Sequence, residues 1–184
     1  MLALWLALGI LGLLILIDVV FALVLIKLFL VRKPYEDERY ILEHAPESWK
    51  KCSKVMLSGL DWMDAQTCEP VEIRSYDGLT LRGIFIPADR PTDRTLLCVH
   101  GYTSTGRMDY SASAPDLHAL GYNLLLPDNR AHGHSDGKLI GFSCVEYRDI
   151  ILWCRYLEKR LGTDCRVALM GISMGAAIVI NAAG

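Results

Sequence analysis

The chain has 184 residues, which is enough for one ordinary domain and too few for two. Its 52% apolar content is concentrated at one end, because residues 1–33 contain 27 apolar side chains and residues 34–184 contain 69, an ordinary globular proportion. The formal net charge is −2, and residues 34–184 carry 16 basic and 20 acidic side chains without a basic stripe. This composition excludes a disordered chain and a multi-span transporter, and we expect no nucleic-acid partner.

The first element is an apolar helix. Residues 2–26 include 18 Leu, Ile, Val or Phe side chains and one charge, Asp18. At a rise of about 1.5 Å per residue, this helix is about 38 Å long, whereas a bilayer's hydrocarbon core is about 30 Å thick. The apolar side chains favour insertion by about 5 kcal/mol, and a central Asp costs about 2.5–3.5 kcal/mol. We therefore expect a transmembrane anchor in residues 1–33, with membrane contact over residues 2–31.

Two other interpretations of this helix remain open, a cleaved signal peptide and a buried helix of a soluble protein. The first basic residue is Lys27 and apolar sequence continues beyond Ala22, which argues against a signal peptide. A buried helix is rarely apolar on all sides. Basic residues follow the span at Lys27, Arg32 and Lys33 and none precedes it, so the positive-inside rule places the globular part in the cytoplasm.

Residues 34–69 are expected to form a helical linker region. The pattern predicts helices over residues 37–44 and 47–65, and Pro46 is suited to open the second. One face of that second helix has amphipathic spacing. Its members are Trp49, Cys52, Met56, Leu60 and Met63.

The next elements are strands. Residues 71–76 and 79–86 alternate apolar and polar side chains on either side of Asp77-Gly78, which predicts an antiparallel hairpin. Short continuous apolar runs follow at residues 96–99, 124–126 and 166–170. Continuous runs of this kind indicate strands that are buried on both faces.

Helical segments separate these runs. The pattern predicts helices over residues 111–120 and 143–161, and another that begins at residue 174. The inward side chains of the second are Val145, Ile150 or Ile151, Trp153, Cys154 and Leu157. Strands that alternate with helices indicate a parallel sheet. Residues 70–184 are thus expected to form an α/β fold in which an antiparallel hairpin leads into a parallel sheet with flanking helices.

The six cysteines show neither C-x-x-C nor a metal-ligand spacing. Four lie in apolar runs, where a thiol behaves as a small apolar group. We expect mostly buried free thiols and no metal site.

Gly171-Ile172-Ser173-Met174-Gly175 is a G-x-S-x-G motif between a predicted strand and a predicted helix. A sharp turn at this place exposes the serine hydroxyl, and a Cβ at either flanking glycine would clash with neighbouring backbone. This context makes Ser173 the candidate catalytic nucleophile.

Two further loops follow buried strands directly. His100-Gly101-Tyr102-Thr103 follows the first, and residues 128–135, Asp-Asn-Arg-Ala-His-Gly-His-Ser, follow the second. With the hairpin and the G-x-S-x-G turn, this order resembles the α/β-hydrolase superfamily. It is most similar to membrane-anchored bacterial hydrolases of the serine aminopeptidase S33-like group, over about residues 70–184.

The resemblance implies roles for these loops. The main-chain N–H groups of Tyr102 and Met174 would form an oxyanion hole. Bracing roles are implied for the polar side chains of residues 128–135, namely Asp128, Arg130, His132 and Ser135. We also expect His100 to brace its loop.

The resemblance implies a triad whose acid and histidine follow the serine. The 11 residues after Ser173 contain no Asp, Glu or His. We therefore expect the chain to be the N-terminal portion of a longer protein, truncated after the nucleophile turn and inactive by itself. The alternative is a complete enzyme that uses another base, for which His132 and His100 are the upstream candidates.

The expected activity of the parent protein is that of a serine hydrolase that cleaves an ester, thioester or amide bond of a small acyl substrate, whether an ester, a lipid or a peptide. No metal or organic cofactor is implied. The alternatives are an acyltransferase or peptidase that uses the same site, and a non-catalytic membrane-tethered module.

Overall fold

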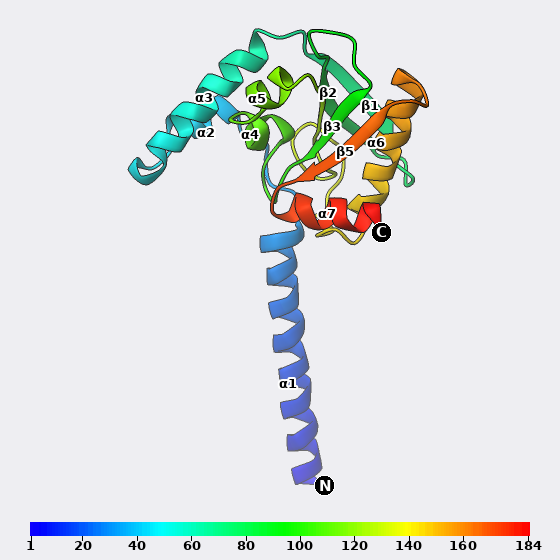
Figure 1. Cartoon of the computed structure of the whole chain (residues 1–184). Coiled ribbons are helices and arrows are strands. Elements are labelled where there is room, and N and C mark those ends of the chain that lie inside the picture. Colours follow the sequence, from blue (N-terminus) through cyan, green and yellow to red (C-terminus); the bar gives the residue numbers. More distant parts are fainter.

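All 184 residues are described by a computed structural model, in which an N-terminal rod projects from an α/β unit (Figure 1). The rod consists of helix α1 (Leu2–Leu25) and one π-helical segment (Ile26–Leu30). It is long and apolar enough to cross a membrane, and none of its side chains is buried in the protein. The interpretation as a core helix is therefore wrong. A signal sequence at the N-terminus can be equally long and apolar, so that alternative to a membrane span stays open.

One five-stranded sheet organises the α/β unit, with the strand order β1-β2-β4-β3-β5. The strands are β1 (Glu69–Arg74), β2 (Thr80–Ile86), β3 (Arg94–Val99), β4 (Asn123–Pro127) and β5 (Arg166–Gly171). The first two form the predicted antiparallel hairpin, in which Ile73 lies opposite Leu81. Strand β2 also pairs antiparallel with β4, while β3 pairs parallel with both β4 and β5.

Helices cover both faces of the sheet (Figure 1). They are α2 (Glu38–Glu43), α3 (Lys50–Asp64), α4 (Gly106–Tyr110), α5 (Ala114–Ala119), α6 (Glu146–Leu161) and α7 (Met174–Ala183). Successive side chains of a strand point to opposite faces of the sheet. In β3, Leu97 therefore packs in one core with Trp153 of α6, and Leu96 packs in the other core with Tyr110 of α4. Burial on both faces explains why β3 and β4 are continuous apolar runs. The prediction that residues 166–170 are buried in the same way is wrong, because β5 is the edge strand of the sheet and none of its residues is buried.

Residues 34–69 do more than connect the rod to the sheet. After a short 3₁₀ turn (Glu47–Trp49), α3 packs Leu60 and Met63 into the same core as Leu42 of α2. The predicted face of this helix is only partly right, since Trp49 and Cys52 are exposed. Figure 1 shows why: the first turns of α3 extend beyond the edge of the globular unit.

The predicted helix over residues 111–120 is shorter in the structure, where α5 covers residues 114–119 and a separate short helix, α4, precedes the predicted range at residues 106–110. Thr105 caps an unpredicted first helix, α4, by accepting a hydrogen bond from the Met108 N–H at 3.1 Å. Pro115 then stands in the first turn of a second helix, α5. The sequence pattern did not predict α4 because the helix is short and begins with Gly106, a residue type of low helix propensity.

The cysteines are all free thiols, but only Cys98 is buried, so the expectation of mostly buried thiols is wrong. Cys52 and Cys144 are exposed and the other three are intermediate. Helix α6 also begins three residues later than predicted.

Candidate active site

Ser173 lies at a strained turn between β5 and α7. Its backbone has φ 52° and ψ −116°, a conformation that L-residues rarely adopt. The flanking glycines permit this turn, because a Cβ on Gly171 would lie 2.3 Å from the Gly175 carbonyl oxygen, and one on Gly175 would lie 2.1 Å from that of Val99. The serine is exposed, as the sequence context predicts for a turn that presents a side chain above the sheet.

The loop of residues 100–103 lies directly beside this turn. A Cβ placed on Gly101 would be 3.3 Å from the Ser173 Cβ. Below them, the buried Tyr110 hydroxyl donates to the carbonyl oxygens of Val99, at 3.2 Å, and Met170, at 2.9 Å. The ends of β3 and β5 are thereby held together beneath the candidate nucleophile.

Two main-chain amides next to Ser173 have no hydrogen-bond acceptor in the protein. In the loop, the Gly101 N–H donates to Asp109 Oδ2 at 2.7 Å and the Thr103 N–H donates to His132 Nε2 at 3.2 Å, while the Tyr102 N–H between them is free. Met174, at the start of α7, also has a free N–H, as the first turn of a helix leaves its donors unpaired.

Both upstream histidines use both ring nitrogens on main-chain groups. His100 Nδ1 lies 2.7 Å from the Gly101 oxygen, and its Nε2 accepts the Asn129 N–H at 2.8 Å. His132 Nδ1 lies 2.9 Å from the Arg130 oxygen, and its Nε2 accepts the Thr103 N–H. Burial lowers the pKa of His100 to about 3 and also lowers that of His132, so both rings are neutral at pH 7. This geometry braces the loops and leaves neither ring free to accept a proton from Ser173.

Acidification is expected to destabilise the folded chain, because unfolding exposes His100 to protonation. Its pKa is about 3 when folded, against an ordinary value of about 6.5, so below pH 6.5 the unfolded chain binds a proton that the folded chain does not. The free energy of unfolding should therefore fall by about 1.4 kcal/mol per pH unit for this residue between those values. Urea unfolding at pH 7.5 and 5.5 measures the effect.

Substitution tests the source of this pH dependence. His100→Gln should reduce the difference between the two pH values, whereas His44→Gln, at an exposed histidine of the chain, should preserve it. An unchanged difference in His100→Gln would contradict the assignment.

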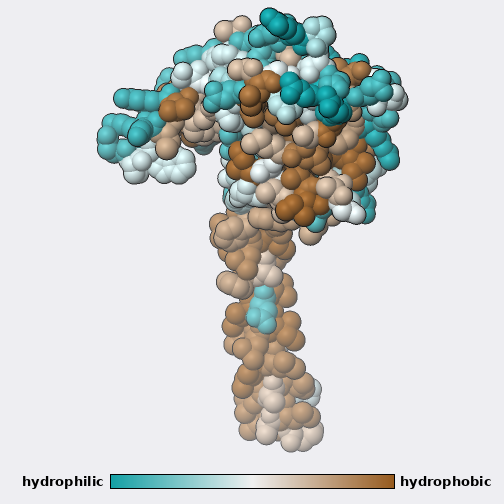
Figure 2. All heavy atoms as spheres, in the orientation of Figure 1, coloured by the Kyte–Doolittle hydropathy of each residue, from teal (hydrophilic) through white to brown (hydrophobic).

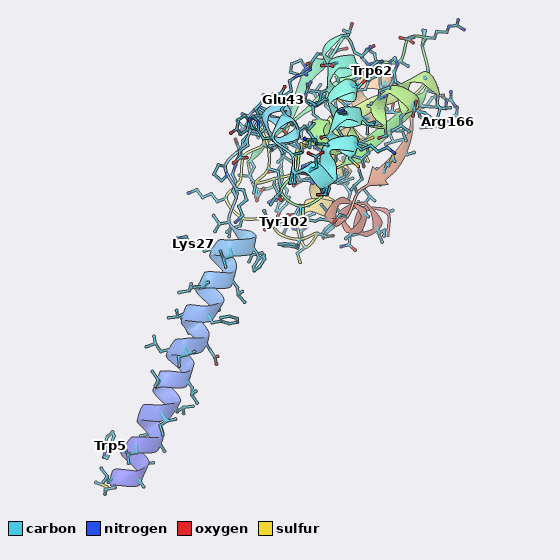
Figure 3. All side chains as sticks on the ribbon, turned by 90° about the vertical axis from the view of Figure 1, so that its left-hand side faces the viewer. Trp5, Lys27, Glu43, Trp62, Tyr102 and Arg166 are labelled. Atoms are coloured by element: carbon cyan, nitrogen blue, oxygen red, sulfur yellow. The ribbon has the colours of Figure 1, made fainter.

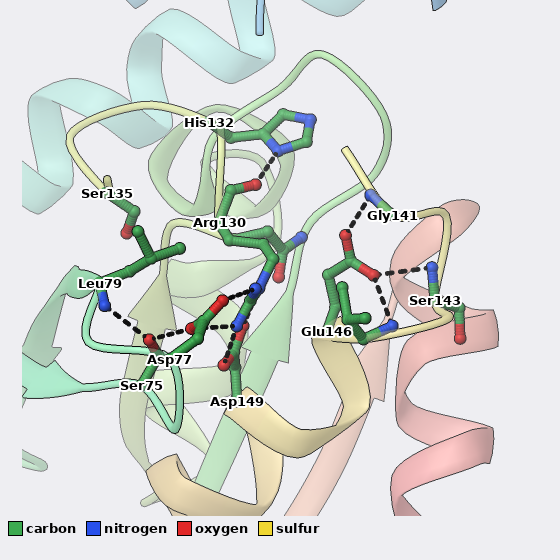
Figure 4. Close-up of polar contacts among 12 residues, drawn as sticks. Ser75, Asp77, Leu79, Arg130, His132, Ser135, Gly141, Ser143, Glu146 and Asp149 are labelled. Atoms are coloured by element: carbon green, nitrogen blue, oxygen red, sulfur yellow. Dashed lines mark hydrogen bonds and ion pairs between the residues drawn. The ribbon is translucent and has the colours of Figure 1, made fainter. Parts of the chain in front are cut away.

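A buried ion pair holds the loop of residues 128–135 (Figure 4). Arg130 Nε and Nη2 donate to the two carboxylate oxygens of Asp149 at 2.7 and 2.8 Å, and both residues are at most 5% exposed. The same guanidinium contacts Asp77 of the hairpin turn at 2.8 Å and holds the pKa of that carboxyl below its usual range. Arg130 thus joins the hairpin, this loop and α6.

Asp128 and Ser135 close the same loop onto its neighbours. The Asp128 carboxylate accepts the Gly106 N–H at 3.1 Å and the His134 N–H at 2.9 Å, and burial raises its pKa. Ser135 Oγ donates to the Asp128 carbonyl oxygen at 2.6 Å and accepts the Arg82 N–H at 2.8 Å. These contacts are structural, in keeping with the bracing roles expected for both side chains.

Sequence reasoning missed two further carboxylates that shape the site. Asp109 accepts both the Gly101 N–H and the Ser104 hydroxyl, the latter at 2.6 Å. The fully buried Glu146 accepts the N–H groups of Gly141 and Ser143 at 2.6 and 3.0 Å (Figure 4). The only signal for Glu146 was its place in the first turn of a helix, where acidic side chains are common.

A mixed sheet with helices on both faces and a strained serine turn after a parallel strand define an α/β-hydrolase. Comparison with known proteins agrees. The model of the family "Serine aminopeptidase, S33" matches residues 90–184. The chain therefore belongs to the serine aminopeptidase S33 family of α/β-hydrolases.

Individual relatives support the same fold. The chain is similar to the uncharacterized protein YqkD of Bacillus subtilis, with 30% identity over 115 residues that cover 61% of this chain and 36% of YqkD. Among solved structures it is similar to the Pyrococcus furiosus esterase Pf2001, with 27% identity, a TM-score of 0.59, and coverage of 83% of this chain and 52% of that one. The α/β-hydrolase GrgF from Penicillium sp. sh18 is 26% identical, with a TM-score of 0.58 and coverage of 63% and 41%. The chain thus spans about a third to a half of the length of these relatives.

Proposed function

We propose that the protein is a membrane-anchored serine hydrolase in which Ser173 attacks an ester, thioester or amide carbonyl. The observation that carries this proposal is the turn at Ser173, which combines a strained backbone, an exposed side chain and two adjacent main-chain amides without acceptors. The similarity to Pf2001, which is an esterase, favours an ester among the three bond types.

The proposed mechanism has two stages. Ser173 Oγ bonds to the acyl carbon while a general base removes its proton, and the carbonyl oxygen becomes an oxyanion that accepts hydrogen bonds from the Tyr102 and Met174 amides. The base then protonates the leaving group as the acyl–leaving-group bond breaks. In the second stage a water molecule, deprotonated by the same base, releases the acyl group and restores the serine.

We propose that the general base and its orienting acid come from outside these 184 residues. The two candidate bases among the upstream histidines, His100 and His132, are neutral and bonded to main-chain groups through both nitrogens. The length of the relatives supports a longer parent protein. By this proposal the 184-residue chain has no serine-dependent esterase activity, whereas the parent protein has.

Three other functions are compatible with the same structure. An acyltransferase would differ only in the acceptor of the second stage, and a peptidase, which the family description suggests, would differ in the leaving group. A non-catalytic membrane-tethered module would keep the fold without activating the serine. The apolar rod supports a single membrane span, and by the positive-inside rule the basic residues after it favour a cytoplasmic globular unit.

A fluorophosphonate probe tests the proposal, because it bonds only to an activated serine. We expect covalent labelling of Ser173 in the parent protein, located by mass spectrometry of the labelled peptide, and no labelling of the 184-residue chain. A folded parent protein that stays unlabelled would support the non-catalytic module instead.

A further inference from the structure

The end of the apolar rod is bonded into the globular unit. The Arg32 N–H donates to the Lys138 carbonyl oxygen at 2.8 Å, and the Ile140 N–H donates to that of Leu30 at 2.7 Å, which forms a short antiparallel bridge. The Arg32 guanidinium also donates to two carbonyl oxygens of residues 133–135, at 2.6 and 2.5 Å. Because main-chain and side-chain bonds act together, the rod does not swing freely from a linker.

Tyr102 connects the rod to the candidate active site. Its hydroxyl donates to the Phe29 carbonyl oxygen at 2.9 Å, in the last turn of the rod, and its ring stacks on Phe142 at 5.1 Å between centroids. Figure 3 shows Tyr102 at the base of the globular unit, close above Lys27. The residue whose amide is the proposed oxyanion donor therefore lies at the end of the apolar helix.

Exposed apolar side chains surround this junction. Leu139, which forms the bridge with Val31, is 56% exposed, and Phe142, three residues further along the chain, is 44% exposed; Val31 is also exposed. Figure 2 shows apolar residues on the side of the globular unit that faces the rod. We call Val31, Leu139 and Phe142 the junction surface. An apolar surface continuous with a membrane-length helix is suited to lipid rather than to water.

Charge near the junction surface is positive. Lys27, Lys33 and Lys138 are exposed around it, and basic side chains at this depth attract anionic headgroups by about 1 kcal/mol each. Aromatic side chains such as Phe142 and Tyr102 complete a pattern of apolar and basic residues that is typical of a membrane interface.

We propose that the junction surface lies in the headgroup region of an anionic phospholipid bilayer, so that the globular unit rests on the membrane and the loop of residues 100–103 faces the lipid. This inference rests on the membrane span of the proposed function, but not on catalysis. We name the lipid surface as the partner because the junction surface lies at the end of the apolar rod. If the rod spans the bilayer, that end lies at the boundary between the hydrocarbon core and the headgroups.

Photo-crosslinking in vesicles tests this contact with the 184-residue chain itself. A benzophenone amino acid is placed at position 139 or 142 and the chain is reconstituted in vesicles of phosphatidylcholine and phosphatidylglycerol. Position 21, in the rod, reports the span, and position 120, an exposed leucine directly after α5, is the matched control. Mass spectrometry measures the fraction of chain bonded to phospholipid.

We expect lipid adducts at positions 139 and 142 within about threefold of those at position 21, and at least tenfold above those at position 120. Adducts at position 21 but only control yields at both junction positions would overturn the inference and leave the span intact. Crosslinks to a second copy of the chain at positions 139 and 142 would overturn it in favour of a dimer. The absence of adducts at position 21 would refute the span, and the inference with it.

Discussion

Replacing Ser173 by alanine is expected to lower kcat/KM of the parent protein for a p-nitrophenyl ester by about 10⁴- to 10⁶-fold. That loss corresponds to about 5–8 kcal/mol of transition-state stabilisation, because without Oγ no acyl-enzyme forms and only binding and the oxyanion donors remain. The substitution removes one exposed oxygen that makes no hydrogen bond in the protein, so the fold should persist. Steady-state kinetics with the purified parent protein measures the effect.

The matched control is Ser58→Ala, which removes the hydroxyl of an exposed serine on α3. It should leave kcat/KM within about twofold of the unsubstituted protein. Full activity in Ser173→Ala would refute the proposed nucleophile, and thermal unfolding of both variants separates lost chemistry from lost structure.

Asp149→Ala should lower the free energy of unfolding by about 3–5 kcal/mol, because it leaves the Arg130 guanidinium buried with only one of its two carboxylate partners. Arg130 and Asp149 are 5% and 4% exposed, so water cannot replace the lost acceptor. We expect the loop of residues 128–135 to loosen first, since Arg130 is its tie to α6. Urea unfolding at pH 7.5 measures the loss.

Asp93→Ala is the matched control, since it breaks another two-bond pair of arginine and aspartate, that of Arg166 with Asp93 at 2.7 and 2.8 Å. The side chains of this pair are 70% and 47% exposed and water screens their charges, so the loss should be much smaller than in Asp149→Ala. Equal losses in the two variants would mean that burial does not govern the strength of the Arg130 pair.

The strands and the serine turn could be predicted because their signals are local. An antiparallel hairpin alternates apolar and polar residues around Asp77-Gly78, and a strand buried on both faces is a short continuous apolar run. The G-x-S-x-G motif carries its own geometry, since both glycines are required by backbone atoms 2.3 and 2.1 Å from the position of a Cβ. The hairpin, the order of the strands along the chain and the class of fold are confirmed, whereas the burial predicted for residues 166–170 is wrong because β5 is an edge strand.

The remaining features depend on contacts between distant segments. The sequence pattern predicts that Asp77 lies in a turn and that Asp149 is a polar residue of a helix. It does not show that both carboxylates form ion pairs with Arg130. Thr105 caps α4 with a hydroxyl that also donates to Glu38, 67 residues away. The exposed Trp49 and Cys52 fit an amphipathic pattern, but no core lies opposite the first turns of α3. Tertiary packing decided each of these cases, and periodicity alone does not encode it.

The bonded end of the rod has a mechanical consequence. An apolar helix of 29 residues is longer than an average hydrocarbon core is thick, so in the proposed membrane-bound state it must tilt or the bilayer must thicken. Because Arg32 and Tyr102 fix the end of the rod to two loops, a tilt of the rod would rotate the whole globular unit by the same angle. Bilayer thickness would then set the angle at which Ser173 faces the lipid, and membranes of different thickness would present the proposed nucleophile in different orientations.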